Sequence, residues 1–212
     1  MSRIVRLEAM KDSLKEAERF LESIPGGVEK VSMRAINRSL TAGKTAMKRH
    51  IAAHYTVDKG TVDDAIQTRR ASPHRLEGEL SASGSPLSSR HFEHDPSGFD
   101  TTGSKRRQIR LRVKKKGSGK QLKSGFLWDG GWGSGKRSIY VRTGEKRRAS
   151  TGHHAGKRYM VESLKKSTSP SVPQMAANEG GQEQIQERMQ EIFEKRVDHE
   201  TRLLLEKGVG KK

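Results

Sequence analysis

The chain has 212 residues, and its 43 Lys and Arg against 25 Asp and Glu give a formal net charge of +18 at pH 7. Only 31% of the residues are hydrophobic while 32% are charged, so the composition supports one modest core and much surface for water or partners. Cysteine is absent, which excludes disulfides and thiolate chemistry, and no stretch is apolar enough to predict a signal peptide or a membrane span.

The N-terminal part predicts a helical hairpin over residues 3–55. Apolar residues recur at spacings of three and four from residue 4 to residue 24, which is typical of an amphipathic helix. The Pro-Gly-Gly segment at 25–27 ends that helix in a turn. A second helix is predicted over residues 28–55, where the small residues at 42–46 leave room for a close neighbour.

The middle of the chain predicts a short helix followed by strands. The helix runs from residue 58 or 59 to about residue 66, and beyond residue 68 the apolar residues alternate with polar ones. In the strand at 109–113 the polar positions are mostly basic, so one face of that strand is basic. The strands are predicted near residues 76–82, 109–113, 125–128, 138–143 and 159–161.

The C-terminal part predicts a linker and a final helix. Two prolines and two glycines make residues 167–181 typical of a linker, and residues 182–207 have the pattern of an amphipathic helix. We therefore expect an α+β domain over residues 1–166, in which N-terminal helices pack on an antiparallel sheet and a basic strand and loop region occupies 67–166. The C-terminal helix follows on the linker.

The positive charge is concentrated in one stretch of the chain. Residues 101–170 contain 20 Lys and Arg but only three Asp and Glu, which places +17 of the total +18 there. Such a surface attracts either phosphates or acidic neighbours in an assembly, and charge alone does not choose between them. No base-reading motif accompanies it, so binding to nucleic acid would be independent of sequence. The predicted DNA- or partner-facing residues are Lys105, Arg106, Arg107, Arg110, Arg112, Lys114, Lys115, Lys116, Lys146, Arg147 and Arg148.

Three patterns resemble a nucleotide-binding loop, a metal site and a catalytic carboxylate pair, but each lacks a feature that its chemistry needs. The glycine-rich segment 130–136 is followed by Arg137, where a phosphate-binding loop has Ser or Thr, and then by a strand instead of a helix. The histidines at 91 and 94 and the pair at 153–154 are too few for a metal site. Two pairs of carboxylates, Asp63 with Asp64 and Glu77 with Glu79, have structural explanations. The first pair lies early in a predicted helix, where acidic groups favour the helix dipole, and the second lies on the outer face of a predicted strand. We predict no catalytic, metal-binding or cofactor-binding residue, and no enzyme.

Apolar residues outside the expected core are candidates for a subunit interface. Trp128 and Trp132 flank the glycine-rich turn, and we expect one to pack in the core and the other to contact a neighbouring subunit. The predicted subunit-interface residues are Trp132 and, on the C-terminal helix, Ile185, Met189, Ile192 and Phe193.

The order of these segments resembles the minor tail protein Z family of lambda-like phages, also called tail completion proteins. The resemblance covers about residues 28–206 and departs from the family pattern at 95–104 and 129–135. It is carried by Ala35-Ile36-Asn37-Arg38, Gly78-Glu79-Leu80, Gly125-Phe126, the segment 139–144, Arg158-Tyr159, the segment 167–175 and the closing helix.

The resemblance implies a structural virion protein at the head-proximal end of the tail, needed for tail completion, head-tail joining and positioning of the DNA end. It also implies a homo-oligomeric ring, which is a hexamer if it matches a sixfold tail, and contacts with the tail terminator, the tail tube, the head-tail connector and packaged genomic DNA. We expect assembly in the host cytoplasm, with which the absence of cysteine is consistent. The alternative is a sequence-independent nucleic-acid-binding protein of a prophage or host, which the charge alone also fits.

Overall fold

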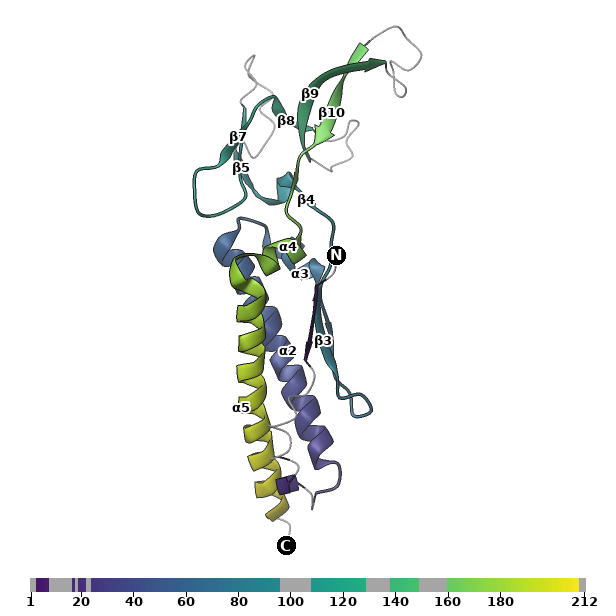
Figure 1. The fold of residues 1–212 in the computed structure, drawn as a ribbon, viewed down its shortest axis with the longest axis vertical. Coiled ribbons are helices and arrows are strands. Elements are labelled where there is room, and N and C mark those ends of the chain that lie inside the picture. Colours follow the sequence, from purple (N-terminus) through teal and green to yellow (C-terminus); the bar gives the residue numbers. More distant parts are fainter. Residues whose placement is uncertain are drawn as a thin grey trace. The chain divides into compact units, whose positions relative to one another are not determined.

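The computed structural model describes residues 3–7, 17, 19–21, 24–95, 108–128, 138–148 and 160–209. It combines long helices with antiparallel sheets, which confirms the predicted α+β class (Figure 1). The chain divides into two compact units whose segments interleave along the sequence, whereas we expected a continuous domain over 1–166. Unit 1 contains residues 1–52, 59–84 and 172–212, and unit 2 contains residues 53–58 and 85–171.

Two long helices dominate unit 1 and lie side by side (Figure 1). They are α2 (Gly27–His54) and α5 (Gly181–Val209), which confirms the helices predicted at 28–55 and 182–207. A turn precedes α2, and Gly26 within it has φ +68°, a conformation that favours glycine. The buried residues of α5 recur at four-residue spacing, so one stripe of the helix faces the interior.

A three-stranded antiparallel sheet completes unit 1, in the order β1-β3-β2. Its central strand packs closely on α2, because a Cβ placed at Gly78 would come within 2.5 Å of Ile36 and 2.7 Å of Leu40. Leu80 of the same strand is fully buried. The strands are β1 (Arg3–Leu7), β2 (Ile66–Arg69) and β3 (Gly78–Ala82), and the short helix α3 (Lys59–Ala65) leads directly into β2.

The predicted N-terminal helix is wrong over residues 3–7, which form β1. Ile4 and Val5 are β-branched and favour an extended backbone, and β3 offers them an edge with which all five residues pair. Residues 17 and 19–21 are helical, with Ala17 and Leu21 buried as the periodicity predicted. The rest of the predicted helix before residue 24 lies outside the described residues.

The predicted linker at 167–181 is also wrong, because the segment is folded. It contains the strand β11 (Thr168–Ser169), the helix α4 (Val172–Ala177) and the 3-10 turn η2 (Asn178–Gly180). Val172 and Met175 of α4 are buried in unit 1. Pro173 stands in the first turn of α4, where no helical N–H bond is lost, so a proline that suggested a linker here begins a helix.

Unit 2 is built from short antiparallel strands in two three-stranded sheets and one strand pair. The sheets have the orders β5-β6-β7 and β10-β9-β8, and β4 pairs with β11. The strands predicted at 109–113, 125–128 and 138–143 are confirmed as β6, β8 and β9, although β9 is longer than expected. The elements are β4 (Leu87–Ser88), η1 (Ser89–His91), β5 (Glu93–Asp95), β6 (Ile109–Arg112), β7 (Lys120–Leu122), β8 (Gly125–Trp128), β9 (Ser138–Arg148) and β10 (Met160–Lys166).

Candidate interaction surfaces

Strand β6 presents basic side chains on one face. Ile109 and Leu111 point to the interior, whereas Arg110 is exposed and Arg112 is half-buried, as the alternating pattern predicted. The Arg112 guanidinium lies 3.5 Å from the Glu93 carboxylate on β5 and donates a hydrogen bond to the Lys115 carbonyl at 2.6 Å. These contacts fix Arg112 in place and leave Arg110 directed outward.

A turn after β6 carries three consecutive exposed residues, Lys114, Lys115 and Lys116. Its backbone is held by the end of α2 and the residues after it: the Lys115 N–H donates to the His54 carbonyl at 2.9 Å, and the Thr56 N–H donates to the Val113 carbonyl at 3.1 Å. Lysine side chains at this turn therefore project from an anchored backbone, and such side chains can contact phosphates or carboxylates.

A second basic cluster occupies the end of β9, where Lys146, Arg147 and Arg148 are exposed. These residues pair through the backbone with Met160–Glu162 of β10. The Lys114–Lys116 turn follows β6, so the two described clusters belong to different sheets of unit 2.

Several predicted sites lie outside the described residues. They are Lys105, Arg106, Arg107, Trp132, the glycine-rich segment 129–135 and the histidine pair at 153–154.

The predicted subunit interface on the C-terminal helix needs correction. Ile185, Met189 and Phe193 are each at most 2% exposed and belong to the core of unit 1. Their stripe packs against α2, where the Ser39 hydroxyl donates a hydrogen bond to the Met189 carbonyl. An amphipathic helix must bury its apolar stripe, and here α2 of the same chain covers it. Ile192 alone among the four is half-buried.

An aromatic group on β8 and β9 was not predicted as a site. The Trp128 ring meets the Tyr140 ring edge to face at 5.2 Å, and the Phe126 ring lies 6.5 Å from Tyr140. The Arg142 guanidinium lies over the Phe126 ring at 5.0 Å and 2.8 Å from the Glu162 carboxylate. Trp128 remains 38% exposed. The signal in the sequence was the alternation of Phe126 and Trp128 in one predicted strand and the presence of Tyr140 in the next.

The acidic and histidine residues considered as chemical groups have structural partners. Asp63 accepts hydrogen bonds from Lys48 at 2.6 Å and is 3.2 Å from Lys44, and these ammonium groups, Lys48 first, hold the pKa of Asp63 below its usual range. His91 lies 3.0 Å from the Asp58 carboxylate. Among the described residues, no group of three or more such side chains could hold a metal ion.

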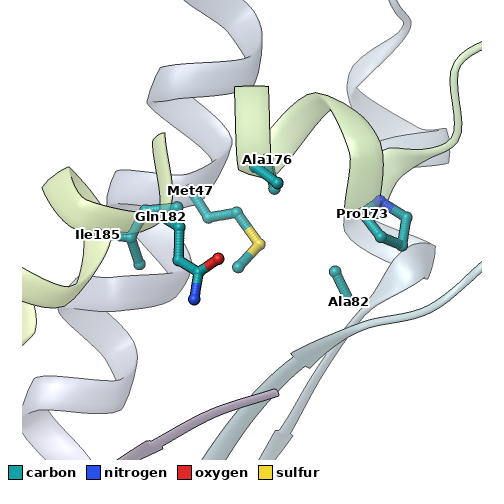
Figure 2. Close-up of a pocket in the computed structure, with 7 residues that line it drawn as sticks. Met47, Ala82, Pro173, Ala176, Gln182 and Ile185 are labelled. Atoms are coloured by element: carbon teal, nitrogen blue, oxygen red, sulfur yellow. The ribbon is translucent and has the colours of Figure 1, made fainter. Parts of the chain in front are cut away.

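A small apolar cavity lies in unit 1 where α4, α5 and β3 approach α2 (Figure 2). Its volume is about 20 Å³, which is the size of a single water molecule. Its lining offers the side-chain amide of Gln182 as a polar group, so it suits neither a cofactor nor a substrate. The lining residues are Met47, Ala82, Pro173, Ala176, Ala177, Gln182 and Ile185.

Comparisons with known proteins identify one family. A family model described as "Prophage minor tail protein Z (GPZ)" matches residues 11–207. No curated protein and no solved structure matches the chain. None of the helices in the described ranges has the length and apolarity that crossing a membrane requires.

Proposed function

The chain belongs to the prophage minor tail protein Z family and is a phage tail protein, and from this premise we propose that it completes the tail at the head-proximal end. In this position it caps the finished tail and presents a surface for joining to the head. The observation that carries the proposal is the family match over residues 11–207. The concentration of positive charge in one stretch of the chain agrees with it. We further propose that the role is structural and involves no catalysis.

The concentrated charge supports a place near packaged DNA. Residues 101–170 hold nearly all of the net charge, and both described clusters, Lys114–Lys116 and Lys146–Arg148, are solvent-exposed. Each phosphate that such a group neutralises releases counterions, so DNA is held without reference to its sequence. A ring of subunits around the channel through which DNA leaves the head multiplies this attraction and positions the end of the genome at the ring. The neighbours of the ring are the tail terminator, the tail tube and the head-tail connector.

Deleting the gene from its phage or prophage tests the tail-completion role. We expect the mutant to make tails that fail to join heads productively, as seen by electron microscopy, and to lose infectivity, while a plasmid copy restores both. Gold-labelled antibody against an epitope tag on the complementing copy should mark the head-proximal end of the tail. Infectious particles of normal appearance without the gene, or label at the distal tip, would contradict the proposal.

The alternative is a free nucleic-acid-binding protein, which the concentration of positive charge also favours. This alternative predicts that the isolated chain binds duplex DNA tightly and in a salt-sensitive manner, and that purified particles lack it. Mass spectrometry of purified virions separates the two, because a tail component must be present in them.

A further inference from the structure

One face of the β8–β9–β10 sheet carries an exposed group of aromatic, aliphatic and basic side chains. The registers Phe126↔Tyr140, Leu164↔Arg142 and Lys166↔Tyr140 place these residues on the same face. Trp128 and Leu164 are 38% and 40% exposed, although both are large and apolar. We call this the aromatic-basic face, and its residues are Phe126, Trp128, Tyr140, Arg142, Leu164 and Lys166.

This composition is typical of a protein contact. Trp, Tyr and Arg dominate the energetic centres of protein interfaces, where an apolar anchor is surrounded by polar groups. Nucleic-acid bases, in contrast, stack on open aromatic faces, and here Arg142 covers Phe126 while the edge-to-face contact of Trp128 with Tyr140 covers another ring face. The face therefore favours a protein partner over single-stranded nucleic acid.

Arg142 is paired with Glu162 of the same sheet, so the remaining positive charge of the face is that of Lys166. This charge favours an acidic partner, and the chain carries an acidic surface on α5. Five carboxylates recur at spacings of three and four along that helix, which places them in one stripe. Glu183, Glu187 and Glu191 each follow a buried position, 181, 185 or 189, by two residues, which is about half a helical turn. Glu194 and Asp198 continue the same stripe, so the stripe faces away from the buried side of the helix. We call this the acidic stripe: Glu183, Glu187, Glu191, Glu194 and Asp198.

Most of the acidic stripe is accessible. Glu183, Glu187 and Asp198 are exposed, while Glu191 is paired within the helix with Arg188 and Lys195. The aromatic-basic face belongs to unit 2 and the acidic stripe to unit 1. Each copy of the chain therefore carries two complementary surfaces on different parts of its fold.

We propose that the aromatic-basic face of one copy docks on the acidic stripe of a second copy. The two surfaces differ, so the contact is heterologous, and repeating it produces a closed ring when the rotation closes. In this contact Trp128 and Leu164 are buried against the helix while Lys166 meets the carboxylates. The inference deepens the proposed ring at the tail end and rests on that function only for its biological setting.

Self-association of the full-length chain tests the docking. We expect oligomers in native mass spectrometry and light scattering at about 50 mM salt and their dissociation at about 500 mM, because screening weakens exposed charge contacts. Trp128→Ala should weaken self-association at least about tenfold, which is about 1.4 kcal/mol, because buried aromatic residues dominate the energy of protein interfaces. Lys120→Ala, at an exposed position of the other sheet, should leave it unchanged.

A charge exchange provides the decisive test. Lys166→Glu alone and Glu187→Lys alone should each weaken association, and mixing the two variants should restore it. In an alternating assembly the substituted face of the first variant meets the substituted helix of the second, and the unsubstituted face of the second meets the unsubstituted helix of the first, so opposite charges meet at every contact. Circular dichroism confirms that each variant is folded. The proposal is overturned if the wild-type chain stays monomeric up to about 100 µM, or if the mixture associates no better than either single variant.

Nucleic-acid binding at the face is the other outcome that would overturn the proposal. In that case Trp128→Ala would abolish binding of a fluorescent single-stranded oligonucleotide while leaving self-association intact. The test is independent of the tail-completion role: a chain that self-associates as proposed but whose deletion leaves infectious phage would refute the proposed function alone.

Discussion

The backbone of α2 at Gly43 approaches Met189 of α5 so closely that a Cβ added to Gly43 would lie 2.5 Å from the Met189 Cγ. Glycine inside a helix costs about 1 kcal/mol relative to alanine, so its presence here reflects the space it leaves. One turn earlier, the Ser39 hydroxyl donates to the Met189 carbonyl. Small residues on α2 thus fix where α5 packs.

Enlarging Gly43 should destabilise unit 1. We expect Gly43→Leu to lower the free energy of unfolding by about 1–3 kcal/mol or more, because the added side chain overlaps Met189 and Leu80. Urea denaturation measures the change. Thr45→Leu introduces the same side chain at an exposed position of α2 and should change stability by less than about 0.5 kcal/mol.

Making room on α5 should recover part of the loss. Met189→Ala in the Gly43→Leu background is expected to cost less than Met189→Ala alone, because the leucine fills the space that methionine vacates. Equal costs in the two backgrounds would mean that the helices do not meet at these residues.

The sequence predicted α2 and α5 well because their apolar residues repeat at helical spacing over many turns. It also predicted a close neighbour for the small residues near Gly43. It did not predict β1, because residues 3–7 become a strand only through pairing with β3, and a local pattern does not show a distant partner. Likewise Pro173 and Gly180 suggested a linker, although both serve folded elements, α4 and η2.

The candidate interaction surfaces were also predicted from the sequence only in part. The alternating basic residues of β6 were predictable from period-two spacing. The apolar stripe of α5 showed that the helix packs, yet nothing local showed that α2 of the same chain covers Ile185 and Phe193. The aromatic-basic face was missed because it requires the register that sets Phe126 beside Tyr140, and register is a property of the sheet.

A buried carboxylate links the two long helices. Glu200 of α5 is 8% exposed in its side chain and lies 2.9 Å from Arg34 of α2, whose side chain is 53% exposed, and 3.8 Å from Arg196. We expect Arg34→Met to lower the free energy of unfolding by about 1–3 kcal/mol, because it leaves a buried carboxylate with weaker compensation.

The matched background is Glu200→Gln, which removes the charge and keeps the volume. There Arg34→Met should cost less than about 0.5 kcal/mol, since no buried charge is left unpaired. A double-mutant cycle by chemical denaturation measures the difference, and additive effects of the two substitutions would show that the ion pair contributes nothing.

The ion pairs of Asp63 should make stability depend on pH in the acid range. Lys48 and Lys44 donate to the carboxylate and lower the pKa of Asp63 in the folded chain, so its stabilising effect is present above the unfolded pKa and is lost as pH falls through the folded pKa. NMR of the carboxyl carbon should give Asp63 a titration midpoint below that of an aspartate in an unfolded peptide.

Asp63→Asn should flatten the dependence of unfolding free energy on pH between about pH 5 and pH 2, because the titrating group is gone. Asp64→Asn removes a neighbouring exposed carboxylate and is the matched control. High salt should shrink the effect at Asp63, since its partners are partly exposed. Identical pH profiles for the two variants would rule out the ion pairs as its cause.

Phosphate contact at the lysine turn after β6 predicts a specific change in salt dependence. If Lys114, Lys115 and Lys116 each neutralise one phosphate, replacing all three with Gln should reduce the slope of log K against log salt by about 2.7 for duplex DNA, whatever its sequence. The matched control replaces Lys30, Arg38 and Arg49, exposed basic residues of α2, and removes the same charge from the chain. Fluorescence anisotropy measures both. A general loss of charge weakens long-range attraction equally in the two variants. Only a larger reduction of the slope in the turn variant than in the α2 variant therefore identifies phosphate contact by the turn. Equal reductions would assign the turn to protein neighbours instead.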